Sequence, residues 1–381
     1  MAGIYLHVPF CKKACHYCNF HFSTSLYSKS DFIAALLKEI ALTSSVKNGG
    51  SDYLGDEIIE TIYFGGGTPS LLDQEELDSI INKLHKSFTI DATAEITFEA
   101  NPDDITLQKL QDWKDAGVNR LSIGVQSFFS EHLLWMNRAH SANQSLSVIE
   151  LAKLEGFTNI SIDLIYGVPG MTNAQWITNL QQAGELGVTH LSCYALTVEP
   201  STALYKLIRQ HKTKDVDEEM QAAQFYILSD WAQSAGYEQY EISNFAKPGM
   251  RSRHNSGYWQ GKKYLGLGPS AHSFNGNSRQ WNIANNALYI KSIHENKLPF
   301  EIESLTPVQQ LNEYIMTSLR TAEGINTKHI EDQFGKEAAL AIDVSTLKYI
   351  HDGRLTNTNG AFQLTRDGKF FADGIAAELF K

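Results

Sequence analysis

Residues 4–18, IYLHVPFCKKACHYC, join a short β-rich run to three closely spaced cysteines. Residues 4–7 have the composition of a buried strand, and Cys11, Cys15 and Cys18 follow in the loop after it. The chain contains one further cysteine, Cys193. This usage favours a metal or catalytic site in the N-terminal loop over a disulfide framework.

Length, composition and charge limit what kind of protein this is. The chain has 381 residues, of which 43% are hydrophobic and 20% charged, enough for one large domain of barrel or doubly wound size and a smaller one. A net charge of −11 argues against nucleic-acid binding, which needs clustered Lys and Arg. No apolar run approaches the roughly 20 residues of a membrane span, and the N-terminus does not resemble a signal peptide. We expect a cytoplasmic protein whose partners are small molecules or proteins.

Five further β-rich runs follow the first one, and helical patterns separate them. Each run is rich in Ile, Val, Tyr and Phe. The six runs are residues 4–7, 61–65, 95–100, 120–125, 159–167 and 189–196. Strands that alternate with helices form parallel sheets, because parallel neighbours need long crossover connections. The pattern predicts an α/β fold, and an open sheet and a barrel both fit it.

Functional groups recur where the predicted strands end. The second run leads into GGGTPS (65–70), in which Thr68 has the place of a helix N-cap before a proline. The third run ends at Glu99, the fourth at Gln126, and the fifth carries Asp163. In a (β/α) barrel the working residues lie at the carboxyl ends of the strands. We therefore predict a partial (β/α)6 barrel of the TIM type with a site at this end.

Three cysteines in one tight loop suit an iron–sulfur cluster. A [4Fe–4S] cluster normally takes four thiolates, so three leave one iron open to a small molecule, as in an open catalytic zinc site. A Cys3His zinc site that uses His16 or His21 is the alternative.

The spacing CxxxCxxC resembles the signature of the radical S-adenosylmethionine (SAM) superfamily. The resemblance covers about residues 1–230 and implies a [4Fe–4S] cluster held by Cys11, Cys15 and Cys18, with SAM chelating the fourth iron. The SAM-binding residues that it implies are Tyr5, Gly65, Gly66, Gly67, Thr68, Glu99, Gln126, Arg138 and Asp163. Acidic and polar groups suit ribose hydroxyls and a methionyl group, and glycine admits a ligand close to the backbone.

Several phrases narrow the resemblance to one branch of that superfamily. YFGGGTPSLL, EANPDD, DLIYGVPGMT, HNSGYW and LGLGPSAHS are similar to the oxygen-independent coproporphyrinogen III oxidase branch, and within it to the heme chaperone family HemW. The oxidases carry a further cysteine at the place of Phe20 and a leader before the first strand. Neither is expected here, which argues against porphyrinogen decarboxylation.

The phrase HNSGYW, residues 254–259, matches an HNxxYW motif of the chaperone family. The resemblance implies heme binding by His254, Asn255, Tyr258 and Trp259. Neutral imidazole is a usual ligand of heme iron, but a His beside Asn in a Gly-containing loop is also a common turn residue. His272 and His16 are the competing ligands.

The resemblance implies a heme chaperone that carries the cluster and SAM and passes heme to an apo-hemoprotein such as a respiratory cytochrome. A biological reductant is a further implied partner, and the absence of a transmembrane segment still allows peripheral membrane contact. The alternative is an enzyme, a radical SAM oxidoreductase that acts on coproporphyrinogen III or another tetrapyrrole.

The last 80 or so residues read as a small helical unit. Thr306 and Pro307 start an amphipathic helix, and Asn359-Gly360 is a hairpin turn signal. The order resembles a winged-helix-like C-terminal domain of the same branch, but the segment is not basic and predicts no DNA binding. We predict a radical SAM domain at 1–230, a connecting region at 231–300 and a C-terminal domain at 301–381.

Overall fold

Six parallel strands form the centre of the fold, in chain order as predicted. The computed structural model describes residues 2–44 and 53–381. Each strand pairs with the next one along the chain. The strands are β1 (Ala2–Val8), β2 (Ile59–Gly66), β3 (Ile90–Ala100), β4 (Arg120–Gln126), β5 (Ile160–Tyr166) and β6 (His190–Ala195). The carboxyl ends of all six therefore meet at one edge of the sheet.

Six shorter strands extend this sheet to twelve strands in the described residues, and the sequence patterns had not predicted them. β9 (Lys263–Leu267) pairs parallel to β1 and is followed outward by β10 (His272–Phe274), β11 (Ser278–Asn282) and β12 (Phe300–Ser304). At the other edge β6 pairs antiparallel with β8 (Asn244–Ala246), which pairs with β7 (Glu238–Glu241). The sheet is open along this order of strands.

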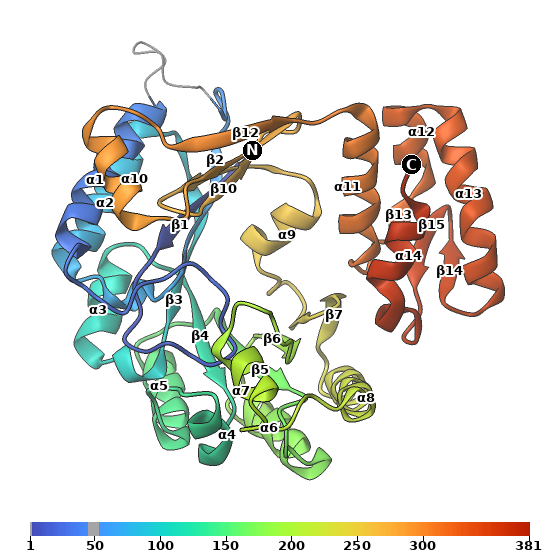
Figure 1. The fold of residues 1–381 in the computed structure, drawn as a ribbon, viewed down its shortest axis with the longest axis horizontal. Helices are drawn as coiled ribbons and strands as arrows, with labels where there is room; N and C mark the ends of the chain where they lie inside the picture. The colour runs from blue at the N-terminus through green and yellow to red at the C-terminus, as the bar shows by residue number, and fades with distance from the viewer. Residues whose placement is uncertain (1, 45–52) are drawn as a thin grey trace.

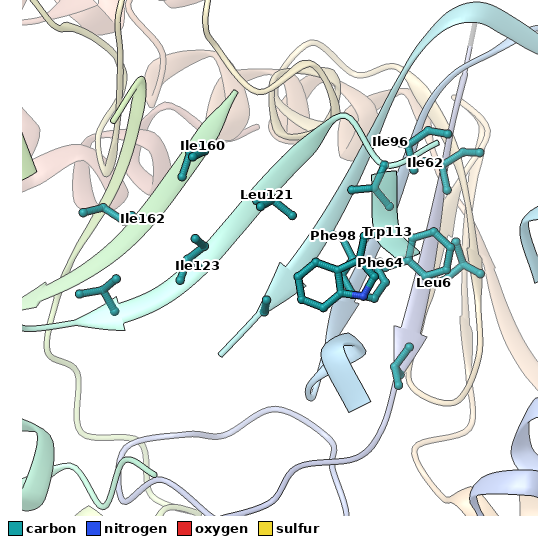
Figure 2. Close-up of a cluster of buried hydrophobic side chains, with 14 of the residues drawn as sticks. Leu6, Ile62, Phe64, Ile96, Phe98, Trp113, Leu121, Ile123, Ile160 and Ile162 are labelled. Atoms are coloured by element: carbon teal, nitrogen blue, oxygen red, sulfur yellow. The ribbon is translucent and has the colours of Figure 1, made fainter. Parts of the chain in front are cut away.

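The two faces of the sheet differ in chemistry because side chains alternate along each strand. Leu6, Phe64, Phe98 and Leu121 are register partners on four neighbouring strands and form one fully buried apolar row. Figure 2 shows this row together with Trp113, whose ring centroid lies 5.0 Å from that of Phe98. This face belongs to the main hydrophobic core.

The residues one position further back along each strand form a polar row on the opposite face. Tyr5, Tyr63, Thr97 and Arg120 are register partners in the same way. Polar side chains thus line the interior of the curved sheet, and they lead toward the carboxyl ends of the strands.

Helices cover the apolar face, and one short helix lies on the polar face. Figure 1 shows α1, α2, α3, α5 and α6 outside the sheet, and α9 between the sheet and α11. The helices of this part are α1 (Lys29–Ser44), α2 (Gln74–Ser87), α3 (Leu107–Asp115), α4 (Ser130–Trp135), α5 (Ala142–Leu154), α6 (Asn173–Glu185), α7 (Ala203–Arg209), α8 (Glu218–Ser234), α9 (Arg253–Trp259) and α10 (Asn286–His294). None of the helices within the described ranges is long and apolar enough to cross a membrane.

The predicted helix start at Thr68 is wrong. Pro69–Leu71 forms only a 3-10 turn, and the Thr68 side chain makes no capping hydrogen bond. The helix α2 starts at Gln74, and Asp73 and Glu76 form its capping box. Thr68 instead donates its hydroxyl to the sulfur of Cys11 at 3.3 Å, so the residue belongs to the cysteine loop rather than to a helix cap.

The C-terminal residues form a separate, mainly helical layer with its own core. Its elements are α11 (Pro307–Leu319), β13 (Ile325–Asn326), α12 (Thr327–Phe334), α13 (Lys336–His351), β14 (Leu355–Thr358), β15 (Ala361–Leu364) and α14 (Ala372–Leu379). The predicted start of α11 is confirmed by a capping box between Thr306 and Gln309. The predicted hairpin is also confirmed, since Asn359 and Gly360 both have positive φ between β14 and β15.

Candidate functional site

Backbone hydrogen bonds from several elements fix the cysteine loop. Cys11 N donates to Ser23 O at 3.0 Å, and Ser23 N donates to Pro9 O at 2.9 Å, which closes the loop at its base. At its far side, His16 N donates to Met136 O at 3.1 Å, and its carbonyl accepts from Leu204 N at 2.7 Å. The loop is therefore held in one place over the carboxyl ends of the strands.

Side-chain hydrogen bonds connect two of the cysteines through the strand ends. Thr68 donates to Cys11 Sγ at 3.3 Å and accepts from Asn101 Nδ2 at 3.1 Å. Arg138 donates to Asn101 Oδ1 at 2.6 Å and to Cys15 Sγ at 3.3 Å. Hydrogen bonds to sulfur tune a metal–thiolate site, and this network is placed to do so at Cys11 and Cys15.

The alternative of a zinc site with His16 or His21 finds no support in the described residues. No group of three or more His, Cys, Asp or Glu in the described residues lies close enough to hold a single metal ion. His16 Nδ1 is hydrogen-bonded to Trp135 O at 2.8 Å, and His21 Nε2 to Asn286 Oδ1 at 2.7 Å.

Burial also affects the protonation of the cysteines and the pairing of Arg138. Burial raises the pKa of Cys11 to about 11 and that of Cys18 above its usual range, so these thiols stay protonated near neutral pH without a metal. The guanidinium of Arg138 is buried, and its Nε has no hydrogen-bond partner among the described residues. This donor is available to a ligand, and a cluster or its small-molecule ligand would supply an acceptor.

The three cysteines line a cavity of about 670 Å³, together with most of the predicted SAM-binding residues. Those that line it are Gly66, Gly67, Thr68, Glu99, Gln126, Arg138 and Asp163. Residues of the C-terminal layer, including Arg320 and Lys369, form the opposite wall. We call this space the cofactor cavity; its volume is typical of small-molecule sites.

Two carboxyl groups in the cofactor cavity hold their protons more strongly than usual. Burial raises the pKa of Glu99 to about 7, although Tyr63 donates to its Oε1 at 2.7 Å, and the charge of Asp163 raises it further. Burial raises the pKa of Asp163 to about 6, against the favourable charges of Arg120 and Arg138. Partly desolvated carboxyls in a cavity are typical of ligand-binding positions.

The glycine-rich segment has a structural role of its own. Gly66 has φ +99°, and a Cβ there would lie 2.5 Å from the ring of His7. A Cβ on Gly67 would lie 2.6 Å from Phe10 O, and one on Gly65 would lie 2.9 Å from the ring of Tyr63. The glycines let the end of β2 pack tightly against β1 and the cysteine loop, and they leave backbone facing the cavity at 66 and 67.

Two predicted SAM-binding residues lie apart from the others. Gly65 and Tyr5 do not line the cofactor cavity; the ring of Tyr5 packs at 6.0 Å against that of Tyr63 inside the sheet. Gln126 does line it and has φ +66°, an unusual conformation for a residue other than glycine. Such backbone strain concentrates at functional sites.

The predicted heme-binding histidine is deeply buried on the polar face of the sheet. His254, in α9, is 3% exposed. Its Nδ1 is hydrogen-bonded to Thr61 Oγ1 at 2.7 Å and its Nε2 to Tyr258 OH at 2.8 Å. Burial lowers its pKa to about 3, so the ring is neutral and both of its nitrogens are already engaged.

The other residues of that segment are arranged around this histidine. Glu95 accepts hydrogen bonds from the backbone N of Arg253 and of His254, both at 3.1 Å, and so caps α9. Tyr258 and Trp259 line a second large cavity, and Asn255 lines neither it nor the cofactor cavity. Of the four predicted heme-binding residues, His254 is buried, Asn255 is half-buried, and Tyr258 and Trp259 lie in the cavity wall. His254 and Tyr258 also line a smaller cavity of about 280 Å³.

Sequence reasoning missed Asn101 and the C-terminal wall residues Arg320 and Lys369. Asn101 follows Glu99 at the end of β3 and sits in EANPDD, so its position at a strand end was the available signal. Arg320 and Lys369 reach the cofactor cavity only through the packing of the C-terminal layer, and no local pattern marks them.

Comparisons with known proteins agree with this geometry. The Radical SAM superfamily model matches residues 5–183, and the HemN C-terminal domain model matches residues 305–371. The structure superposes on coproporphyrinogen III oxidase (HemN) from Escherichia coli with a TM-score of 0.85, at 23% identity, covering 100% of this chain and 90% of that one. At that identity the match establishes the fold. The fold and the cysteine loop define the class of radical SAM proteins.

Curated relatives define the family more narrowly. Heme chaperone HemW of Bacillus subtilis (strain 168) is 34% identical over 98% of both chains. Heme chaperone HemW of Mycobacterium tuberculosis (strain H37Rv) is 32% identical over 99% of this chain and 94% of its own. The chain belongs to the HemW family, which confirms the resemblance inferred from the sequence.

Proposed function

We propose that this protein is a heme chaperone of the HemW type that binds heme and delivers it to an apo-hemoprotein such as a respiratory cytochrome. The observation that carries the proposal is the three-cysteine loop over a cavity of about 670 Å³, in a chain that matches HemW relatives along its whole length. The match over the C-terminal layer matters because that layer forms one wall of the cavity.

Cys11, Cys15 and Cys18 would hold a [4Fe–4S] cluster in this proposal, with SAM at the open iron. When bound, the cluster supplies electrons one at a time and SAM is the group that it reduces. Arg138 supports Cys15 through its hydrogen bond to the sulfur and has a free buried donor for a ligand. Glu99 and Asp163 are placed to accept hydrogen bonds from ribose hydroxyls or an amino group.

Gly66, Gly67, Thr68 and Gln126 complete the proposed SAM site from the ends of β2 and β4. Tyr5 and Gly65 would support it from behind, since both contact the Tyr63 ring that holds Glu99. The division at residues 230 and 300 stays part of the proposal, with the last unit acting as the wall of the site.

The segment from His254 to Trp259 would contribute to heme binding. Support comes from its matching an HNxxYW motif and from Tyr258 and Trp259 facing a cavity. A reductant for the cluster would be a further partner.

The rival function is oxidation of a tetrapyrrole such as coproporphyrinogen III. It uses the same cluster and SAM, but Phe20 stands where the oxidases carry a further cysteine. Anaerobic incubation of the cluster-loaded protein with coproporphyrinogen III, SAM and a reductant tests it. Formation of protoporphyrinogen would favour the rival.

An anaerobic heme titration of the cluster-loaded protein tests the chaperone proposal directly. We expect a saturable, shifted Soret band, followed by loss of that band when apomyoglobin is added as a heme acceptor. Titration without saturation would refute heme binding as a function of this chain.

A further inference from the structure

Arg120, the first residue of β4, is a buried cation in the interior of the curved sheet. It is 1% exposed, and it belongs to the polar row that includes Tyr63 and Thr97 on the two preceding strands. Figure 2 shows Leu121, the next residue, on the opposite, apolar face. A guanidinium stays charged at any physiological pH, so the fold buries a permanent positive charge at this place.

The guanidinium of Arg120 lacks hydrogen bonds that usually accompany a buried charge. Its Nε and Nη1 are buried and have no partner among the described residues. The ring of His190 offers no acceptor, because its two nitrogens are bonded to Ser161 Oγ and Tyr240 OH, both at 2.7 Å. Burying a charge without partners is costly, so these two nitrogens do not stabilise the fold through hydrogen bonds.

Arg120 lies one step below the floor of the cofactor cavity. Side chains alternate along a strand, so Ser122 and Gln126 follow Arg120 on the same face of β4, and both line the cavity. Ser122 is the register partner of Glu99 on β3. The arginine therefore leaves its strand one pleat below the level at which Glu99 lines the cavity.

The charge of Arg120 acts on both carboxyl groups that line the cofactor cavity. Burial raises the pKa of Glu99 to about 7 and that of Asp163 to about 6, and the positive charge of Arg120 opposes both shifts. Arg138 opposes the shift of Asp163 as well, but it also donates to Cys15 Sγ. Arg120 is thus a cation that favours the ionised carboxyls without a hydrogen bond to the cysteine loop.

The other titratable groups that face Arg120 are neutral or already bonded. Burial lowers the pKa of two imidazoles and raises the pKa of two phenols, so all four groups are uncharged near neutral pH. These groups are His190, His254, Tyr63 and Tyr240. Glu95, at the amino end of the same face of β3, accepts hydrogen bonds from two backbone amides of α9. In the described residues, Glu99 and Asp163 are therefore the groups whose ionisation can respond to this charge.

We infer that Arg120 is a positioning residue of the proposed SAM site, whose buried charge keeps Glu99 and Asp163 ionised so that they accept hydrogen bonds from the ribose hydroxyls and the amino group of SAM. The inference rests on the proposed function, because it takes the cofactor cavity as the SAM site. A direct effect of Arg120 on SAM would have the opposite sign, since SAM carries a net positive charge and like charges repel. Removal of Arg120 should weaken binding if it acts through the carboxyls and strengthen binding if it acts directly.

The pH dependence of stability in the cluster-free chain tests the effect on the carboxyl groups. Arg120→Met removes the charge, and Arg209→Met is the matched control, because Arg209 is exposed at the end of α7 and does not line the cofactor cavity. Without Arg120 the pKa values of Glu99 and Asp163 in the folded state rise further, so the fall of stability with rising pH should continue about one pH unit higher. Urea unfolding at pH 5, 7 and 8.5 measures this fall. At pH 5 we expect Arg120→Met to be at least as stable as the unaltered chain, since the unpaired charge is gone.

Anaerobic titration calorimetry of SAM into the cluster-loaded chain tests the effect on binding. Arg120→Met should weaken the affinity by about tenfold at pH 7, as a rise of about one pH unit in both carboxyl pKa values requires, and the affinity should recover at pH 8.5. Arg120→Lys should bind SAM nearly as the unaltered chain does, because it retains the positive charge. Combined with Asp163→Asn, which removes one of the two carboxyls, Arg120→Met should cause a smaller loss.

Three results would overturn the inference. The first is an equal loss of stability in Arg120→Met at every pH, and the second is SAM binding at pH 7 that is as tight as in the unaltered chain or tighter. The third is failure of both Arg120→Met and Arg120→Gln to fold, because the arginine would then be required for folding itself. If the unaltered cluster-loaded chain does not bind SAM, the proposed SAM site is refuted and the inference with it, which is distinct from the three results above.

Discussion

The two ends of the same parallel strands both carry polar side chains, yet the two regions differ in how their polar atoms are satisfied. At the carboxyl ends, Arg138 has a buried donor without a partner, and Glu99 and Asp163 face a cavity. Near the amino ends, His254 and Glu95 have protein partners at short distance. The first region therefore presents polar groups to a cavity, whereas His254 and Glu95 are paired within the protein. Pairing at the amino ends is not complete, because Arg120 Nε and Nη1 and Ser256 Oγ are also buried without a partner in the described residues.

The role of a residue in a family motif therefore depends on whether its polar atoms have partners within the protein. Cys11 and His254 both belong to phrases that match the family. A buried polar atom with a protein partner is satisfied within the fold, whereas one without a partner in the wall of a cavity is available to a ligand. The predictions below test whether the two regions respond to mutation as differently as their hydrogen bonding suggests.

The largest effect is expected for Cys15→Ala, which should abolish the iron–sulfur cluster. Two thiolates cannot hold the cluster as three do, and Arg138 would lose its sulfur acceptor. Iron content and the iron–sulfur absorption band after anaerobic reconstitution measure this. Cys193→Ala is the matched control, because Cys193 is buried in the core; a Cys15→Ala protein that retains its iron would contradict the cluster assignment.

The next effect concerns the surroundings of His254 near the amino ends of the strands. His254→Ala should lower the free energy of unfolding by about 2–4 kcal/mol, because it creates a cavity and leaves two hydroxyl groups without a partner. Tyr258→Phe removes one of these hydrogen bonds and should cost about 1 kcal/mol. Urea unfolding of the cluster-free protein measures both. Unchanged stability of His254→Ala would show that this region is not the structural layer described above.

A mutation in the cofactor cavity should instead change ligand binding and leave stability unchanged. Asp163→Ala should weaken SAM binding to the cluster-loaded protein by about tenfold or more. The stability of the SAM-free protein should not fall, because burial raises the pKa of this carboxyl and such a group contributes little to folding. Anaerobic isothermal titration calorimetry measures the affinity. Glu295→Ala is the control, because Glu295 is an exposed residue directly after α10 and does not line the cofactor cavity. Equal affinities in the two variants would remove Asp163 from the site.

The smallest effect is a pH dependence of the cluster-free protein. The pKa values of Asp163 and Glu99 are raised to about 6 and about 7 on folding. The folded state therefore binds more protons than the unfolded state, and stability falls as pH rises through about 4 to 7. We expect Asp163→Asn to reduce this fall by about 1 kcal/mol. Parallel unfolding curves at pH 5 and pH 8 measure it, and an unaltered slope would contradict the raised pKa.

Sequence patterns predicted the centre of the fold correctly. Runs rich in Ile, Val, Tyr and Phe located all six parallel strands, and the Asn359-Gly360 signal located the hairpin, because both depend on local backbone preference. The extension of the sheet by β9 to β12 was not predicted. These strands are short, and the pairing of β9 with β1 joins residues more than 200 positions apart.

The assignment of Thr68 shows a related limit. Its place before Pro69 is typical of a helix cap, but its hydroxyl bonds to Cys11 from another part of the chain. A local pattern cannot show that a tertiary partner competes for the same hydroxyl group. Lys369 was missed for the same reason, since it reaches the cofactor cavity through long-range packing, whereas Asn101 had a local signal in its place directly after β3.

The sequence by itself determined the cysteine loop, the order of the strands and the family, because spacing and periodicity are encoded by neighbouring residues. The tertiary structure alone decided which polar groups are satisfied. In the folded chain both ring nitrogens of His254 form hydrogen bonds, with Thr61 and Tyr258, whereas Arg138 keeps an unpaired donor. A second cavity forms between layers that are distant in the chain. Hydrogen-bond saturation depends on three-dimensional neighbours, and only folding brings those neighbours together.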